Sequence, residues 1–171
     1  MDLRAEILRD FSKPHTLKIT NYIGDDPDRF SELMTLFLGQ EYRVTQRAAW
    51  VVSHCCDKHP NLLLPFLEKI IANLANDIPV AVKRNTVRVL QSVDVPEELM
   101  GPLADHCFRY LADAKETIAV KVFAMTILAN IAKKFPDLKG ELRLMIEDQL
   151  PLGSAGFVNR GMKILKALEK L

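Results

Sequence analysis

The sequence lacks the features that mark a membrane or secreted protein. No apolar run approaches the roughly 18 residues that a membrane-spanning helix needs. Charged residues interrupt the N-terminal stretch MDLRAEILRDF, which is therefore unlike a signal peptide. There are only three cysteines, and Cys55 and Cys56 are adjacent, so no disulfide framework is expected. These absences predict a cytoplasmic protein that makes no contact with a membrane.

The motifs of common catalytic and nucleotide-binding sites are also missing. The chain has no GxxxxGK[ST], GxGxxG, HExxH or GxSxG pattern. The one dense cluster, HCCDKH, offers Cys55 and His59 at i, i+4 spacing, but zinc needs more protein ligands than this pair. A nucleophilic thiol at Cys55 or Cys56, assisted by Lys58 or His59, is the enzymatic alternative. We therefore predict no metal, no cofactor and no enzymatic activity.

The sequence does contain an internal repeat. Four segments align without a gap and begin at Val44, Val82, Val120 and Val158, a constant step of 38 residues. Within each segment, residues 0, 4, 7 and 11 are mostly apolar and lie on one face of an amphipathic helix. Four further helices are predicted between these segments, over residues 28–39, 62–76, 97–113 and 138–150. The unit is therefore a hairpin of a first and a second helix.

This unit resembles the HEAT repeat. Its second helix carries the pattern V-[KR]-x-x-A-x-x-x-[LI], most closely as VKVFAMTIL from Val120, and the resemblance covers about residues 26–171. The chain departs from the family pattern at Thr45, Asn159, Gly161 and Met162. The resemblance implies an all-α fold: a right-handed α-α superhelix, or HEAT-like solenoid, of about four hairpins after an N-terminal helical pair.

We expect a single domain over residues 1–171. It begins with an N-terminal helical cap, residues 1–24, and continues with repeats at about 25–59, 60–94, 95–135 and 136–171. In the last second helix, Lys166 and Glu169 stand where the other three have apolar residues, which predicts the polar outer face of a terminal repeat.

The repeat alignment also assigns ordinary roles to the HCCDKH cluster. Cys55 shares its column with Val93 and Ile131, so we expect a buried thiol that packs as a small hydrophobic group. His59 aligns with Phe135 in the loop between helices, where a flat ring can pack against the helix end.

Charge is divided unequally between the two kinds of helix. The net charge is +1, but the segments that hold the second helices (41–59, 79–94, 115–135 and 154–171) carry 14 Lys/Arg and 5 Asp/Glu. The segments that hold the first helices (25–40, 60–78, 95–114 and 136–153) carry 5 Lys/Arg and 14 Asp/Glu. Second helices line the concave surface of HEAT-like solenoids, so the resemblance implies a basic inner face and an acidic outer face.

The leading interpretation is a non-enzymatic binding or scaffold module whose basic concave face holds an acidic protein or peptide. The predicted partner-binding residues are Arg47, Trp50, His54, Arg84, Arg88, Lys121 and Arg160. Tryptophan beside arginine is enriched at binding hot spots, although Trp50 has an alternative place under the N-terminal helices. The other interpretation is nucleic-acid binding by the same face, because the resemblance extends to HEAT-like DNA glycosylases. Against it, the chain is poor in aromatic residues and nearly neutral.

Overall fold

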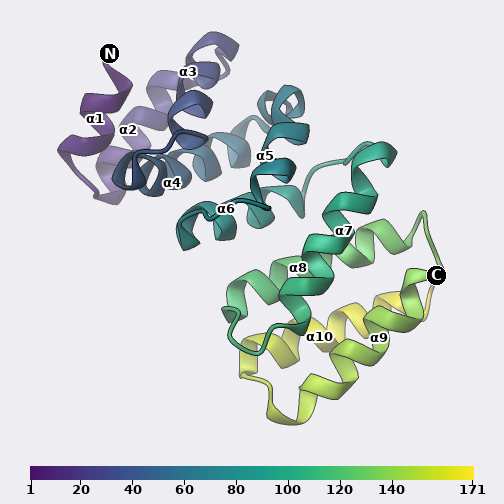
Figure 1. The fold of residues 1–171 in the computed structure, drawn as a ribbon. Helices are drawn as coiled ribbons and strands as arrows, with labels where there is room; N and C mark the ends of the chain where they lie inside the picture. The colour runs from purple at the N-terminus through teal and green to yellow at the C-terminus, as the bar shows by residue number, and fades with distance from the viewer. The chain divides into compact units, whose positions relative to one another are not determined.

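The computed structural model describes residues 1–171, and every regular element in it is a helix (Figure 1). The predicted all-α fold of helical hairpins is confirmed. The chain divides into two compact units, Met1–Val89 (unit 1) and Leu90–Leu171 (unit 2). No helix combines the length and the apolar character that crossing a membrane requires.

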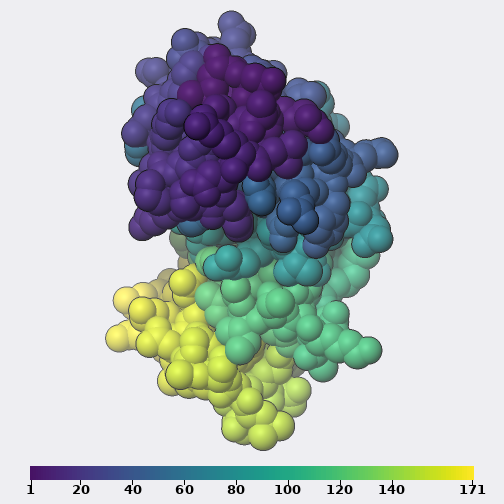
Figure 2. Space-filling model, turned by 90° about the vertical axis from the view of Figure 1, so that its left-hand side faces the viewer, coloured from purple at the N-terminus to yellow at the C-terminus, as the bar shows by residue number.

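Unit 1 is built around one long helix. Its elements are α1 (Leu3–Arg9), α2 (Lys13–Ile23), α3 (Pro27–Phe37), α4 (Tyr42–Lys58), the 3-10 helix η1 (Pro60–Phe66), α5 (Leu67–Asn73) and α6 (Val80–Leu90), which ends at the unit boundary. Helix α4 packs against α1, α2, α3 and η1. The N-terminal helices, purple in Figure 2, cover one face of this unit.

The predicted apolar stripe of α4 is buried in unit 1. Val44, Ala48, Val51 and Cys55 are each at most 2% exposed. Burial of an apolar side chain contributes about 1.5–3 kcal/mol, so this stripe accounts for much of the attachment of α4 to its neighbours. The prediction that Cys55 belongs to the core is confirmed.

Unit 2 repeats the arrangement around α8. Its helices are α7 (Glu97–Ala112), α8 (Ile118–Ala132), α9 (Leu138–Gln149), the 3-10 turn η2 (Leu150–Leu152) and α10 (Ala155–Leu168). Helix α8 packs against α7, α9 and α10, and the first helices α7 and α9 also touch each other (Figure 1). The stripe Val120, Ala124, Ile127 and Ile131 is buried, as the repeat predicts.

The last helix corrects one detail of the repeat pattern. Met162, which the alignment places in the buried stripe, is 55% exposed, whereas its neighbour Gly161 is buried. A Cβ atom at Gly161 would stand 3.0 Å from Ile146 Cγ2, so α10 approaches α9 closely at this glycine. The buried face of α10 is therefore rotated by one residue, and Lys166 and Glu169 point to solvent as predicted.

Candidate functional site

Arg47 is held by the backbone of the N-terminal helix. Its Nη1 donates hydrogen bonds to the carbonyl oxygens of Leu8, at 2.8 Å, and Ile7, at 3.3 Å. These carbonyls belong to the last turn of α1, where no intrahelical donor is left for them. The guanidinium also lies 5.4 Å from the centre of the Phe11 ring. Arg47 therefore joins α4 to the end of α1, and little of its charge is available to a partner.

Trp50 and His54 extend the same cluster along α4. The Trp50 ring packs edge-on against Phe11, with ring centres 5.3 Å apart, and its other neighbour is the His54 ring at 5.8 Å. Phe11 lies between α1 and α2, so the alternative place for Trp50, under the N-terminal segment, is the one observed. His54 Nε2 is buried without a hydrogen-bond partner, and burial lowers the pKa of this imidazole.

The two predicted arginines of α6 differ in their surroundings. Arg88 forms a two-armed ion pair with Asp57 of α4, with N–O distances of 3.1 and 2.9 Å. Both side chains are partly exposed, so the pair contributes at most about 1 kcal/mol. Arg84 is exposed, and no acidic side chain pairs with it. Of the predicted partner-binding residues, Arg84 is the one whose charge is fully available to a partner.

Lys121, one of the predicted partner-binding residues, is buried instead of exposed. The side chain is only 7% exposed, and its Nζ donates a 2.8 Å hydrogen bond to Gln149 Oε1. Gln149 in turn donates from Nε2 to the carbonyl oxygens of Leu111 and Met145. The physical reason is the position of Lys121 beside Val120, on the arc of α8 that α7 and α9 cover.

Arg160 cross-links elements of unit 2. Its Nη1 donates hydrogen bonds to Thr126 Oγ1 on α8 and to Gln91 Oε1, and the side chain is half-buried. Arg47 and Arg160 thus make the same kind of contact in different units. Each donates hydrogen bonds from a second helix to oxygen atoms outside that helix. The structure brings Arg47, Trp50 and His54 together in unit 1 but leaves Lys121 and Arg160 outside that cluster.

The cysteines are in surroundings that disfavour thiolate formation. Burial raises the pKa of Cys55 and of Cys56 to about 12, and it raises that of Cys107 as well. A thiol is nucleophilic only as the thiolate, so these side chains are not prepared for attack at neutral pH. Across residues 1–171 there is also no group of three or more His, Cys, Asp and Glu side chains placed to hold a metal ion.

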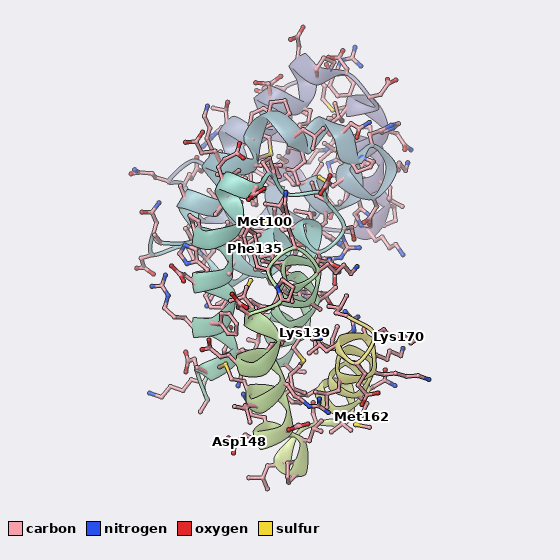
Figure 3. The ribbon with its side chains drawn as sticks, turned by 90° about the vertical axis from the view of Figure 1, so that its right-hand side faces the viewer. Met100, Phe135, Lys139, Asp148, Met162 and Lys170 are labelled. Carbon is pink, nitrogen blue, oxygen red and sulfur yellow. The ribbon has the colours of Figure 1, made fainter.

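The sequence-based set missed a basic stripe at the end of unit 2. Lys163 and Lys166 on α10 and Lys170 in the turn that follows are all exposed, and none has an acidic partner. Their spacing of i, i+3 and i+7 places them on one side of a helix, which is the signal that would have identified them jointly. The exposed Met162 lies on α10, ahead of the turn that holds Lys170 (Figure 3).

Comparison with known proteins agrees with the arrangement of helical hairpins. A family model for the HEAT repeat domain matches residues 3–167, which is nearly the whole chain. No curated protein and no solved structure gives a significant match.

Proposed function

The chain belongs to the HEAT repeat family, whose members generally serve as non-catalytic scaffolds for protein interactions, and we propose that it is a binding module for an acidic protein segment. The contact residues in this proposal are the exposed cations on the second helices, or in the turn after α10, that bond to no other side chain. In unit 1 these are Arg43 and Arg84, and in unit 2 they are Lys163, Lys166 and Lys170.

The observation that carries the proposal is that these cations are not neutralised within the protein. Each of the five side chains is exposed and has no carboxylate partner in the structure. Unpaired charges of one sign create a potential that attracts the opposite charge and accelerates association. Arg47, Lys121 and Arg160 are left out of the contact surface because they already serve intramolecular hydrogen bonds.

Unit 1 supplies a second element of the proposal. His54, whose ring packs against Trp50, lies close enough to Arg88 for the arginine charge to act on it, and Arg88 stands one turn along α6 from Arg84. Trp50 keeps part of its ring surface accessible while Phe11 holds it in place. A tryptophan whose rotamer is already fixed loses little entropy when a partner covers it, so Trp50 is the expected apolar anchor in this unit.

The test is capture of binding proteins from a nuclease-treated cell extract by the immobilised full chain. We expect acidic proteins to be retained by the wild type and lost by a variant that combines Arg84→Glu, Lys163→Glu and Lys166→Glu. A matched control carries Lys69→Glu, an exposed lysine of the first helix α5, and is expected to retain them. Circular dichroism must show that both variants remain folded.

Two other outcomes of the capture experiment are possible. Retention that is seen only in a parallel extract without nuclease assigns the cations to nucleic acid, and a steep log-linear loss of affinity with salt would accompany it. If the triple variant captures the same acidic proteins as the wild type, the second-helix cations are not the contact surface and the proposal is wrong.

A further inference from the structure

A groove lies between the first helices α7 and α9 of unit 2, and none of the proposed contact cations lines it. Its volume is about 700 Å³, and its apolar lining comes from Met100, Ala104, Phe108, Ile131, Phe135 and Leu138. Met100 and Phe135 lie near each other in Figure 3, at the end of the helix pair where α9 begins. The size is that of a cleft able to receive side chains of a ligand or peptide.

Small residues on α7 keep this groove open. Gly101 lines it, and a Cβ atom added there would meet nothing within 4 Å. Ala104 follows one turn later and contributes only a methyl group. Phe135 at the entrance remains 39% exposed. Covering apolar surface of this kind contributes about 25 cal/mol per Å², so a fitting apolar side chain would be stabilised here.

Unit 1 has a groove at the corresponding place in the repeat, which serves as an internal comparison. It lies between α3 and η1, has a volume of about 630 Å³, and is lined in part by His59, Leu62 and Pro65. These residues stand 76 positions, or two repeats, before Phe135, Leu138 and Glu141. The groove is therefore a repeated feature of the fold, and its chemistry is what distinguishes the two copies.

The rims of the two grooves carry different charge. The unit 1 groove has one acid, Asp25, and one lysine, Lys58, which is bonded to Asn21. The unit 2 groove has three acids, Asp105, Asp137 and Glu141, against a single arginine, Arg109.

Arg109 does not neutralise the acids of the unit 2 rim. Its Nε donates to the backbone carbonyl of Asp105 at 3.2 Å, and its Nη2 lies 3.4 Å from His106 Nδ1. None of the three rim carboxylates forms an ion pair, and all three side chains are exposed. The result is an apolar floor surrounded by unpaired negative charge.

We propose that the α7–α9 groove docks a basic amphipathic segment of a partner protein. The apolar side chains of that segment enter the floor formed by Met100, Phe108 and Phe135, and its lysines or arginines meet Asp105, Asp137 and Glu141. Charge complementarity selects this occupant, because an acidic segment would place like charges next to three unpaired carboxylates. The site shares no residue with the second-helix cations and takes a basic partner, whereas those cations take an acidic one.

The experiment uses two fluorescein-labelled peptides, each about four helical turns long. One carries leucines on one face and lysines on the other, and its counterpart replaces every lysine by glutamate. Fluorescence anisotropy with the full chain is expected to show saturable binding of the lysine peptide and none of the glutamate peptide.

Variants locate the binding on the groove. The pair Asp105→Lys and Glu141→Lys is expected to weaken binding of the lysine peptide by at least about tenfold, since two attractive contacts become repulsive. Gly101→Leu fills the groove without changing charge and is expected to weaken binding similarly. The matched controls are Gly101→Ala, whose methyl group meets open space, and Asp148→Lys, at the far end of α9 in Figure 3. Both are expected to bind within about twofold of the wild type.

Two results would overturn the proposal. One is equal loss of binding in Asp148→Lys and in the groove variants, which would indicate attraction to the acidic surface in general. The other is failure of the wild type to bind the lysine peptide at any attainable concentration. The triple variant of the second-helix cations, with Arg84→Glu, Lys163→Glu and Lys166→Glu, is expected to bind this peptide at least as well as the wild type, so the two proposals fail independently.

Discussion

Helices α4 and α8 bury the same register positions although they lie 76 residues apart. In α4 the buried residues are Val44, Thr45, Ala48, Ala49, Val51, Val52, Ser53, Cys55 and Cys56. In α8 they are Val120, Lys121, Ala124, Met125, Ile127, Leu128, Ala129, Ile131 and Ala132. The two sets match position by position, which shows that packing of the hairpin decides which positions are covered.

The chemistry at matched positions differs between the two helices. Thr45 bonds to the Tyr42 carbonyl within its own helix, whereas Lys121 at the same position reaches Gln149 on α9. Ser53 donates to Asn85 Oδ1 on α6, while its counterpart Ala129 makes no polar contact. A buried position in this fold therefore accepts a polar side chain wherever a neighbouring helix offers the complementary group.

Core truncation at a matched position is expected to have the largest effect. Leu128→Ala in α8 should cost about 2–5 kcal/mol of unfolding free energy. Val52→Ala in α4, at the same register, should cost less because fewer buried atoms are removed. Urea unfolding followed by circular dichroism measures both. Equal losses would mean that the two cores do not share the packing that their register implies.

The buried lysine provides the next test of the comparison. Gln149→Leu leaves the Lys121 ammonium buried without its acceptor, which should destabilise unit 2 by about 1–3 kcal/mol or more. Adding Lys121→Met to Gln149→Leu removes the charge as well and is expected to recover most of the loss. Urea unfolding of the two single variants and the double variant gives the coupling energy. Additive effects would show that the two side chains do not depend on each other.

Arg47 is engaged in hydrogen bonds within unit 1, whereas Arg84 is exposed and available to a partner. Arg47→Ala removes two hydrogen bonds to α1 carbonyls and should cost about 1–2 kcal/mol. Arg84→Ala removes an exposed side chain without a partner and should change stability by no more than about 0.5 kcal/mol. Thermal unfolding of both variants is the measurement. A larger loss for Arg84→Ala would contradict the assignment of Arg84 to the binding surface.

The smallest expected effect is a pH dependence from His54 in unit 1 and His106 in unit 2. Burial lowers the pKa of both imidazoles below the usual 6.5; Asp57 partly opposes this at His54, and Arg88 adds to it. The unfolded chain therefore binds more protons, so unfolding free energy should fall as the pH drops through about 6.5. Unfolding at a series of pH values should give a shallower slope for His54→Gln than for the wild type. An unchanged slope would show that His54 takes no part in the effect.

The groove proposal offers a comparison of the same kind, with the unit 1 groove as the reference. Its rim has equal numbers of acidic and basic side chains, whereas the unit 2 rim is acidic. Binding of the lysine peptide is therefore expected to map to residues of α7 and α9 by NMR chemical-shift changes. Equal changes around His59 and Pro65 would show that the apolar floor alone decides binding.

The repeat in the sequence was sufficient for the fold but only partly for the site. The apolar columns correctly predicted the hairpins and the burial of Cys55, because an amphipathic helix has one way to bury its stripe. The same columns placed Met162 in the buried stripe, where it is exposed, and Lys121, predicted as a partner-binding residue, is buried. At Met162 the arc rotates because Gly161 lets α9 approach closely, a contact between the two helices of the last hairpin.

The sequence by itself determined the repeat unit, the alternation of acidic first helices and basic second helices, and the core positions of α4 and α8. These are periodic properties of single helices, so they can be read along the chain. Only the tertiary structure decided which cations remain available to a partner. Arg47 donates hydrogen bonds to α1, Lys121 to Gln149 and Arg160 to Thr126, while Arg84 is left unpaired. The physical reason is that the partner of a polar side chain lies on another helix, at a distance set by packing rather than by the local pattern.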